Sequence, residues 1–189
     1  YRAVVFLNTG IASPLTDAQR GVFETYFRKG GAFVGIGSAI ETDASWQFLT
    51  DVLGTRASSR TEQQTGAVKV FARVHDASKT LPLVWNRDDH WYNLTGNVRG
   101  VSHVLATVVE DPFGPQPQGQ TLDGIAGGTM GAHHPVSFCK DYQGGRSFYT
   151  GLGHTKESYK DSLFMEHVLQ GLQYAMGDDK PNYSKAVSK

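Results

Sequence analysis

The sequence predicts an α/β fold in one domain, because patterns of buried strand and amphipathic helix alternate along its first part. Residues 2–8 form a short apolar run, typical of a strand buried on both faces. A helix follows, with Thr16 and Gln19 matching a capping box at its start and Gly30 ending it. Residues 33–36 form a second short apolar run and predict another buried strand. A strand–helix–strand unit with short connections predicts a parallel βαβ crossover.

The rest of the chain continues this alternation. Apolar periodicity predicts helices at 44–53 and 161–175 and strands at 66–74 and 103–109. Two further strands flank a Gly-Gly turn and predict a hairpin, at 135–139 and 146–150. Residues 112–128, rich in Gly, Pro and Gln, predict a loop, and 177–189 a linker or tail. The domain is therefore expected to span residues 1–176.

Composition excludes several classes of protein. The 189 residues include 18 basic and 18 acidic side chains, so the zero formal charge argues against a nucleic-acid partner. The lone Cys139 excludes an internal disulfide and a CxxC site. No apolar run approaches the ~18 residues of a membrane span, so no membrane insertion is expected.

One cluster of polar and aromatic residues resembles the lining of a sugar-binding cleft. Asp89, His90, Trp91, Tyr92 and Asn93 place a carboxylate, an imidazole, two aromatic rings and an amide in consecutive positions. Aromatic faces beside hydrogen-bonding groups bind sugars by stacking and by directional bonds. In an extended segment the two rings would point to opposite sides, so at least one of them is also a candidate for the core.

The histidines around the predicted hairpin form a second candidate cluster. His133 and His134 precede one strand, and His154 follows its partner. Because antiparallel pairing returns the chain, we expect these histidines near one edge of the sheet. Such a set suits general acid–base chemistry or a divalent metal such as zinc, although the spacing matches no standard metal motif.

Six segments of the chain together resemble the ThuA-like family, named for trehalose utilisation and similar in fold to class I glutamine amidotransferases. They are residues 3–9, 15–19, 30–36, 89–93, 134–136 and 144–155, the last (GGRSFYTGLGHT) being the most specific. The resemblance implies a flavodoxin-like three-layer sandwich with a mostly parallel sheet, ending in a hairpin and a C-terminal helix. It also implies a role in carbohydrate metabolism.

Family habits lead to two further expectations. Members usually begin with another strand and helix, which would precede Tyr1, so the domain is expected to lack that unit. Members also occur beside sugar dehydrogenase or carbohydrate-binding domains in secreted bacterial proteins. The resemblance therefore favours a secreted or extracellular location, with other domains of one polypeptide as partners.

The sequence departs from the family pattern at several polar positions. Gly37 stands where the family usually has histidine and amidotransferases have cysteine, so glutamine amidotransferase activity is excluded. Glu41 replaces a common aspartate, His90 a usual glutamate and His133 a common aspartate. The family residues that are retained are Asp89, Trp91, Tyr92, His134 and His154.

Three functions fit these residues. The first is an enzyme that acts on a sugar or oxidised sugar, with Asp89 and His134 as the acid–base pair and His154 assisting or binding a metal. Its substrate contacts would be Glu41, His90, Trp91, Tyr92, Asn93 and His133. The second is a non-catalytic carbohydrate-binding or accessory module. The third is a structural domain that self-associates through an exposed sheet edge.

Overall fold

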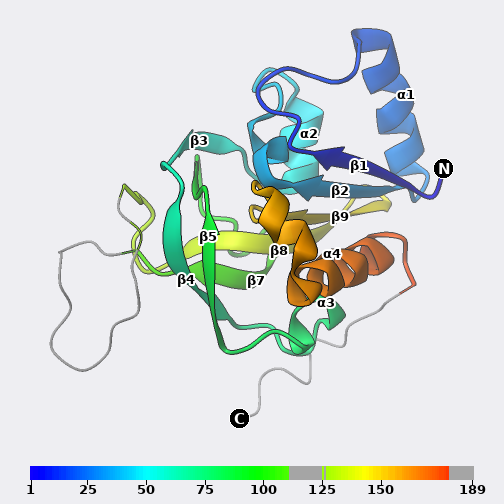
Figure 1. Cartoon of the computed structure of the whole chain (residues 1–189). Coiled ribbons are helices and arrows are strands. Elements are labelled where there is room, and N and C mark those ends of the chain that lie inside the picture. The colour runs from blue at the N-terminus through cyan, green and yellow to red at the C-terminus, as the bar shows by residue number, and fades with distance from the viewer. Residues whose placement is uncertain (111–124, 126, 179–189) are drawn as a thin grey trace, which may run out of the picture.

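The computed structural model describes residues 1–110, 125 and 127–178 (Figure 1). Its helices and strands, with η for short 3-10 helices, are β1 (Ala3–Leu7), α1 (Asp17–Arg28), β2 (Ala32–Ile36), η1 (Gly37–Glu41), α2 (Gln47–Leu53), β3 (Ala57–Arg60), β4 (Gln64–Val70), α3 (Asp76–Lys79), β5 (Val84–Asp89), β6 (Tyr92–Leu94), β7 (His103–Val108), β8 (His134–Tyr142), β9 (Gly145–Thr150), η2 (Lys156–Lys160) and α4 (Ser162–Ala175).

Seven of the strands form one curled sheet in the order β1-β2-β9-β8-β7-β4-β5 (Figure 1). In a second, smaller sheet β3 pairs with β6. Only the pairs β1–β2 and β2–β9 are parallel; the other four neighbouring pairs of the large sheet are antiparallel. The expectation of a mostly parallel sheet was therefore wrong, and the sheet is mixed. Parallel neighbours need long crossover connections, whereas β8–β9 and β4–β5 are antiparallel neighbours that follow one another along the chain.

Helices cover both faces of the large sheet, so neighbouring residues of β2 and β9 enter different cores. In β2, Phe33 packs with the aromatic residues of α1 and α2, whereas Val34 packs into a second core with Phe164 of α4. The α/β class is thus confirmed. The helix α3 lies beside α4 on the second face (Figure 1).

The predicted strand–helix–strand unit is confirmed as β1, α1 and β2. The Thr16 hydroxyl accepts a hydrogen bond from the Gln19 N–H, and the Gln19 side chain accepts one from the Thr16 N–H, as a capping box requires. The strand β1 is nevertheless not buried on both faces, since Val5 is 46% and Leu7 50% exposed. It is the end strand of the sheet, and the buried side of β1 is the one that Phe6 presents to α1.

Most remaining sequence predictions of elements are also confirmed. The hairpin is β8–β9, the closing helix is α4, and the helix expected at 44–53 is α2, which ends at Gly54 with φ +84°. Residues 111–124, 126 and 179–189 lie outside the described part, and with them most of the predicted 112–128 loop and of the 177–189 tail. Across the described residues, no helix has the length and apolar character that crossing a bilayer requires.

Candidate active site

The carboxyl ends of β1, β2 and β9 are tied together by one asparagine. Asn8, which follows β1 with φ +48°, donates from Nδ2 to the Gly153 carbonyl at 2.9 Å. Its Oδ1 accepts from the Ser38 N–H at 3.1 Å. Gly37 adopts φ +57°, and a Cβ there would lie 2.0 Å from Asn8 Oδ1. The positive φ and this close approach both favour glycine at position 37, and a larger residue would require the Asn8 side chain to move.

A buried carboxylate fixes the segments that carry two histidines. Asp89 is fully buried, and its Oδ2 accepts from the Gly153 N–H at 2.8 Å. Its Oδ1 accepts from the N–H groups of His90 at 3.0 Å and His154 at 3.2 Å. Burial raises the pKa of the Asp89 carboxyl, and these three donors oppose that rise. One side chain therefore positions the backbone of both histidines.

The imidazoles of His90 and His154 are in contact. Their ring centroids lie 4.1 Å apart with an interplanar angle of 75°. His90 Nδ1 lies 2.9 Å from the Thr61 carbonyl, an acceptor, so Nδ1 carries the proton and Nε2 of the neutral ring is an acceptor. The Nδ1 atom of His154 is buried and has no hydrogen-bond partner among the described residues. Burial, and secondly the neighbouring His90, lowers the pKa of His154, so its ring is a neutral base at pH 7.

A glutamate–arginine pair stands beside the imidazoles. Arg60 Nη1 lies 3.6 Å from Glu41 Oε2, with the arginine side chain 46% and the glutamate side chain 16% exposed. Both charges act on the pKa of His154, Glu41 raising it and Arg60 lowering it. Burial and then Glu41 raise the pKa of the Tyr92 hydroxyl. The site therefore joins Glu41, His90, Tyr92 and His154 with Arg60, which the sequence analysis missed because it is an isolated charge in a short strand.

Glu41 also lines a polar cavity of about 370 Å³ between the end of η1 and β3. Its other lining residues include Asp43, Ser45, Ser58 and Ser59, which come from the segment after η1 and from β3. Carboxylates and hydroxyls in such a cavity can exchange hydrogen bonds with a hydroxylated ligand.

His134 is buried and bonded on both sides of its ring. Nδ1 lies 2.7 Å from Glu110 Oε1, and Nε2 lies 2.8 Å from the Tyr92 carbonyl. Glu110 also accepts from the N–H groups of Met130 at 2.8 Å and Gly131 at 2.7 Å. Both ring nitrogens of His134 are therefore engaged with protein acceptors. The bond from Nε2 holds the backbone at Tyr92 in place. Glu110 was not predicted, since no local pattern indicates that a carboxylate will be buried.

The other predicted substrate contacts lie in different surroundings. Trp91 is 1% and Tyr92 3% exposed, so both rings of the predicted sugar platform are inside the fold. The Trp91 indole N–H donates to the Gln64 carbonyl at 3.1 Å. Asn93 is buried with its amide bonded to protein groups, and His133 is exposed. Their roles as substrate contacts stay predictions.

No group of three or more His, Cys, Asp or Glu side chains in the described residues is arranged to hold a metal ion. The arrangement at His90 and His154 is instead one of two nitrogen bases beside a buried carboxylate and an ion pair. Such a set can accept a proton at one position and return it at another.

This is an α/β domain with a paired-imidazole site at the carboxyl edge of its parallel strands. The family model ThuA, described as trehalose utilisation, matches residues 1–175, and the chain belongs to that family. No curated protein sequence matches the chain significantly.

Solved structures of ThuA-like proteins share the fold. One from Parabacteroides merdae has a TM-score of 0.72 at 20% identity, and one from Bacteroides uniformis a TM-score of 0.74 at 22% identity. In both comparisons the match covers 95% of this chain and 71% of the other. A β-galactosidase from Bacillus circulans sp. alkalophilus is similar over 96% of this chain but 23% of its own, with a TM-score of 0.59 at 16% identity.

Proposed function

We propose that this domain catalyses proton transfer on a sugar or oxidised sugar, with His90 and His154 as the acid–base pair. The observation that carries the proposal is the contact between these two rings above a buried Asp89 that holds both of their backbone segments. Membership of a family described as trehalose utilisation supports a carbohydrate as the substrate.

His154 acts as the base, because its lowered pKa keeps the ring neutral at pH 7. In an oxidised sugar it takes the proton from the carbon next to the carbonyl group, and the C–H electron pair moves into the resulting enolate. The proton that His154 has taken passes by way of His90 Nε2 to the adjacent carbon, or to the leaving oxygen as its C–O bond breaks. The products are those of isomerisation or of β-elimination, and no electrons are gained or lost.

Glycoside hydrolysis fits the described residues less well, since it uses two carboxyl groups that face the scissile bond. The two Asp89 oxygens already accept hydrogen bonds from three backbone N–H groups. The Glu41 carboxylate forms an ion pair with Arg60. In this proposal Asp89 is a positioning residue, and His134, with both ring nitrogens bonded, holds Tyr92. Glu41, which lines the polar cavity, and its ion-pair partner Arg60 contact the sugar beside the imidazoles.

The test is solvent deuterium exchange. The protein is incubated in D2O with reducing sugars, ketoses and uronic acids, and loss of the C–H signal next to the carbonyl group is followed by NMR. The variant H154A should lose at least 100-fold in exchange rate while keeping the urea unfolding midpoint. The control is H103A, which removes an exposed histidine from β7.

Equal exchange by wild type and H154A would remove His154 from the mechanism. Sugar signals that broaden without exchange would show binding without catalysis. They would favour the non-catalytic carbohydrate-binding module over the enzyme. No exchange and no binding across the panel would overturn the carbohydrate function.

Self-association is a second candidate, favoured by one observation. The strand β1 is at the end of the sheet, and it exposes Val5 and Leu7. An open strand edge beside an apolar surface can pair with another chain. Light scattering should then show a species larger than the 20.6 kDa monomer, and V5K should return it to the monomer. A monomer at all concentrations would exclude this function.

A further inference from the structure

The peptide group that joins Gly153 to His154 is held by hydrogen bonds at both ends. Its carbonyl, on Gly153, accepts from Asn8 Nδ2 at 2.9 Å and from the Tyr159 hydroxyl at 2.8 Å. Its N–H, on His154, donates to Asp89 Oδ1 at 3.2 Å. Because a peptide group is planar, bonds at its carbonyl and at its N–H together fix the plane. The backbone from which the His154 side chain extends is therefore held in one orientation.

The imidazole of His154 depends on this backbone for its own position. Its Nδ1 is buried and has no hydrogen-bond partner among the described residues, so no bond from that atom orients the ring. The ring centroid nevertheless lies 4.1 Å from that of His90. A misplacement of about 1 Å between reacting groups can lower a rate about 100-fold. The groups that fix the peptide before His154 therefore also position the proposed base.

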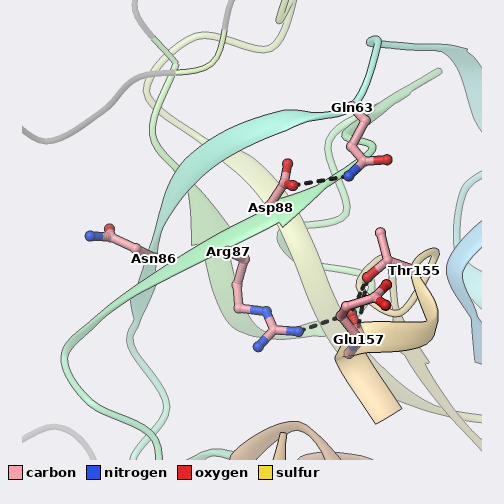
Figure 2. Close-up of a pocket in the computed structure, with 7 residues that line it drawn as sticks. Gln63, Asn86, Arg87, Asp88, Thr155 and Glu157 are labelled. Atoms are coloured by element: carbon pink, nitrogen blue, oxygen red, sulfur yellow. Dashed lines mark hydrogen bonds between the residues drawn. The ribbon is translucent and has the colours of Figure 1, made fainter. Parts of the chain in front are cut away.

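The short helix η2, which carries Tyr159, is held in place at both ends. At its start, the Thr155 side chain accepts from the Ser158 N–H at 3.4 Å. In the pocket between β5 and η2, Arg87 extends from β5 toward the helix (Figure 2). Its guanidinium donates to Ser158 Oγ at 3.0 Å and pairs with Asp161, the residue that ends η2. The Tyr159 hydroxyl is thus presented from a fixed support.

Tyr159 combines a packed ring with a hydroxyl that donates its proton. The ring meets Phe164 edge-on, with centroids 5.3 Å apart and an interplanar angle of 89°. Burial, and secondly the Asp89 charge, raises the pKa of the Tyr159 hydroxyl, so it remains a donor at pH 7. Asn8, the other donor to this carbonyl, also bonds the chain just after β2. The tyrosine hydroxyl is therefore the donor that can be removed without disturbing the sheet.

We propose that Tyr159 is a positioning residue for the base His154 and acts through its hydrogen bond to the Gly153 carbonyl. The inference rests on the proposed function, which gives Tyr159 no role. Because the hydroxyl is bonded to the backbone, Tyr159 should affect the rate of proton transfer more than the affinity for the sugar.

The variant Y159F removes this hydrogen bond and keeps the ring, while the Gly153 carbonyl keeps its bond from Asn8. In the deuterium-exchange assay we expect kcat to fall about tenfold and KM to change by less than about twofold. The matched control is Y174F, which removes the bond from a tyrosine hydroxyl of α4 to Asp141 Oδ1 at 3.0 Å. It should leave kcat and KM unchanged. The urea unfolding midpoints of the two variants should be similar, because each loses one hydrogen bond.

NMR of the free protein gives a second readout that needs no substrate. In Y159F the contact between the rings of His90 and His154 should weaken. The pKa of His154 should rise toward its ordinary value, because a displaced ring is less buried. In Y174F the ring contact and the pKa should both be those of the wild type.

The two readouts separate this inference from the proposed function. An unchanged kcat in Y159F, or a His154 ring contact and pKa equal to those of the wild type, would overturn the role of Tyr159. Exchange that depends on His154 would in that case still stand. A kcat that falls equally in Y159F and Y174F would also overturn it, because the effect would not pass through Gly153. If the wild type exchanges no proton, the proposed function fails, and the NMR comparison still decides whether Tyr159 positions His154.

Discussion

Replacing Asp89 with asparagine tests how strongly one carboxylate supports the site. The two are nearly the same size, but asparagine carries one oxygen and one NH2 group. If its oxygen keeps the His90 and His154 N–H groups, its NH2 group faces the Gly153 N–H, 2.8 Å from the present oxygen. The variant then has a buried N–H without an acceptor, which costs about 1–3 kcal/mol. It also loses the charge-assisted strength of the other two bonds. We expect the free energy of unfolding to fall by about 3 kcal/mol.

The assay is urea unfolding at pH 7 followed by circular dichroism, with D88N as the matched control. Asp88 is exposed and accepts from a surface glutamine, so its replacement should change stability by no more than about 0.5 kcal/mol. The ring contact of His90 and His154 should be weakened in D89N, because Gly153 precedes His154 and loses its bond, and NMR shifts of both rings should change. A D89N protein as stable as D88N would refute the view that these three N–H bonds hold the site.

Two further predictions concern pH and backbone geometry. Burial lowers the pKa of His75 and His167 to about 4, so the unfolded chain binds protons that the folded chain does not, and stability should fall as the pH drops from about 6.5 to 4. In H167Q about 3 kcal/mol of that loss should be absent, as measured by urea unfolding at several pH values across this range. If stability depended on pH in H167Q as it does in wild type, the lowered pKa of His167 would be contradicted. G37A should destabilise the fold by several kcal/mol more than G10A, because both glycines have positive φ but only a Cβ at Gly37 meets a neighbouring atom. Equal unfolding midpoints would show that the Asn8 side chain moves away from the new Cβ at no cost in stability.

The parts of the fold that follow from local signals were predictable. The capping box at Thr16, the stop at Gly30 and the turn at Gly144 set the limits of α1, β2 and the β8–β9 hairpin. The order of strands was not predictable, because pairing depends on contacts between residues far apart in the chain. The strand β5 was missed as well. It is an edge strand in which every second side chain is exposed, and its residues after Trp85 are polar, so it lacks a clear apolar pattern.

The candidate site was predictable in its chemistry more than in its geometry. The sequence indicated Asp89 and His90 because a carboxylate, an imidazole and two aromatic rings are consecutive there, and His154 because it follows a strand of the predicted hairpin. Burial of Trp91 depends on the packing of the segment between β5 and β6, which no local pattern sets. Arg60 came from a strand without a motif, and its place beside Glu41 is set by tertiary structure.

Two of the three bonds of Asp89 also join strands that the sheet order separates. The carboxylate is at the end of β5, the end strand opposite β1, yet it bonds the chain just after β9, with β8, β7 and β4 lying between them. Edge strands usually fray first, but here fraying of β5 would break the site itself. Opening of the β4–β5 hairpin and loss of the imidazole pair are thus one cooperative event. A sugar bound at His90 and His154 should slow amide hydrogen exchange along the whole hairpin, including residues that the ligand never touches.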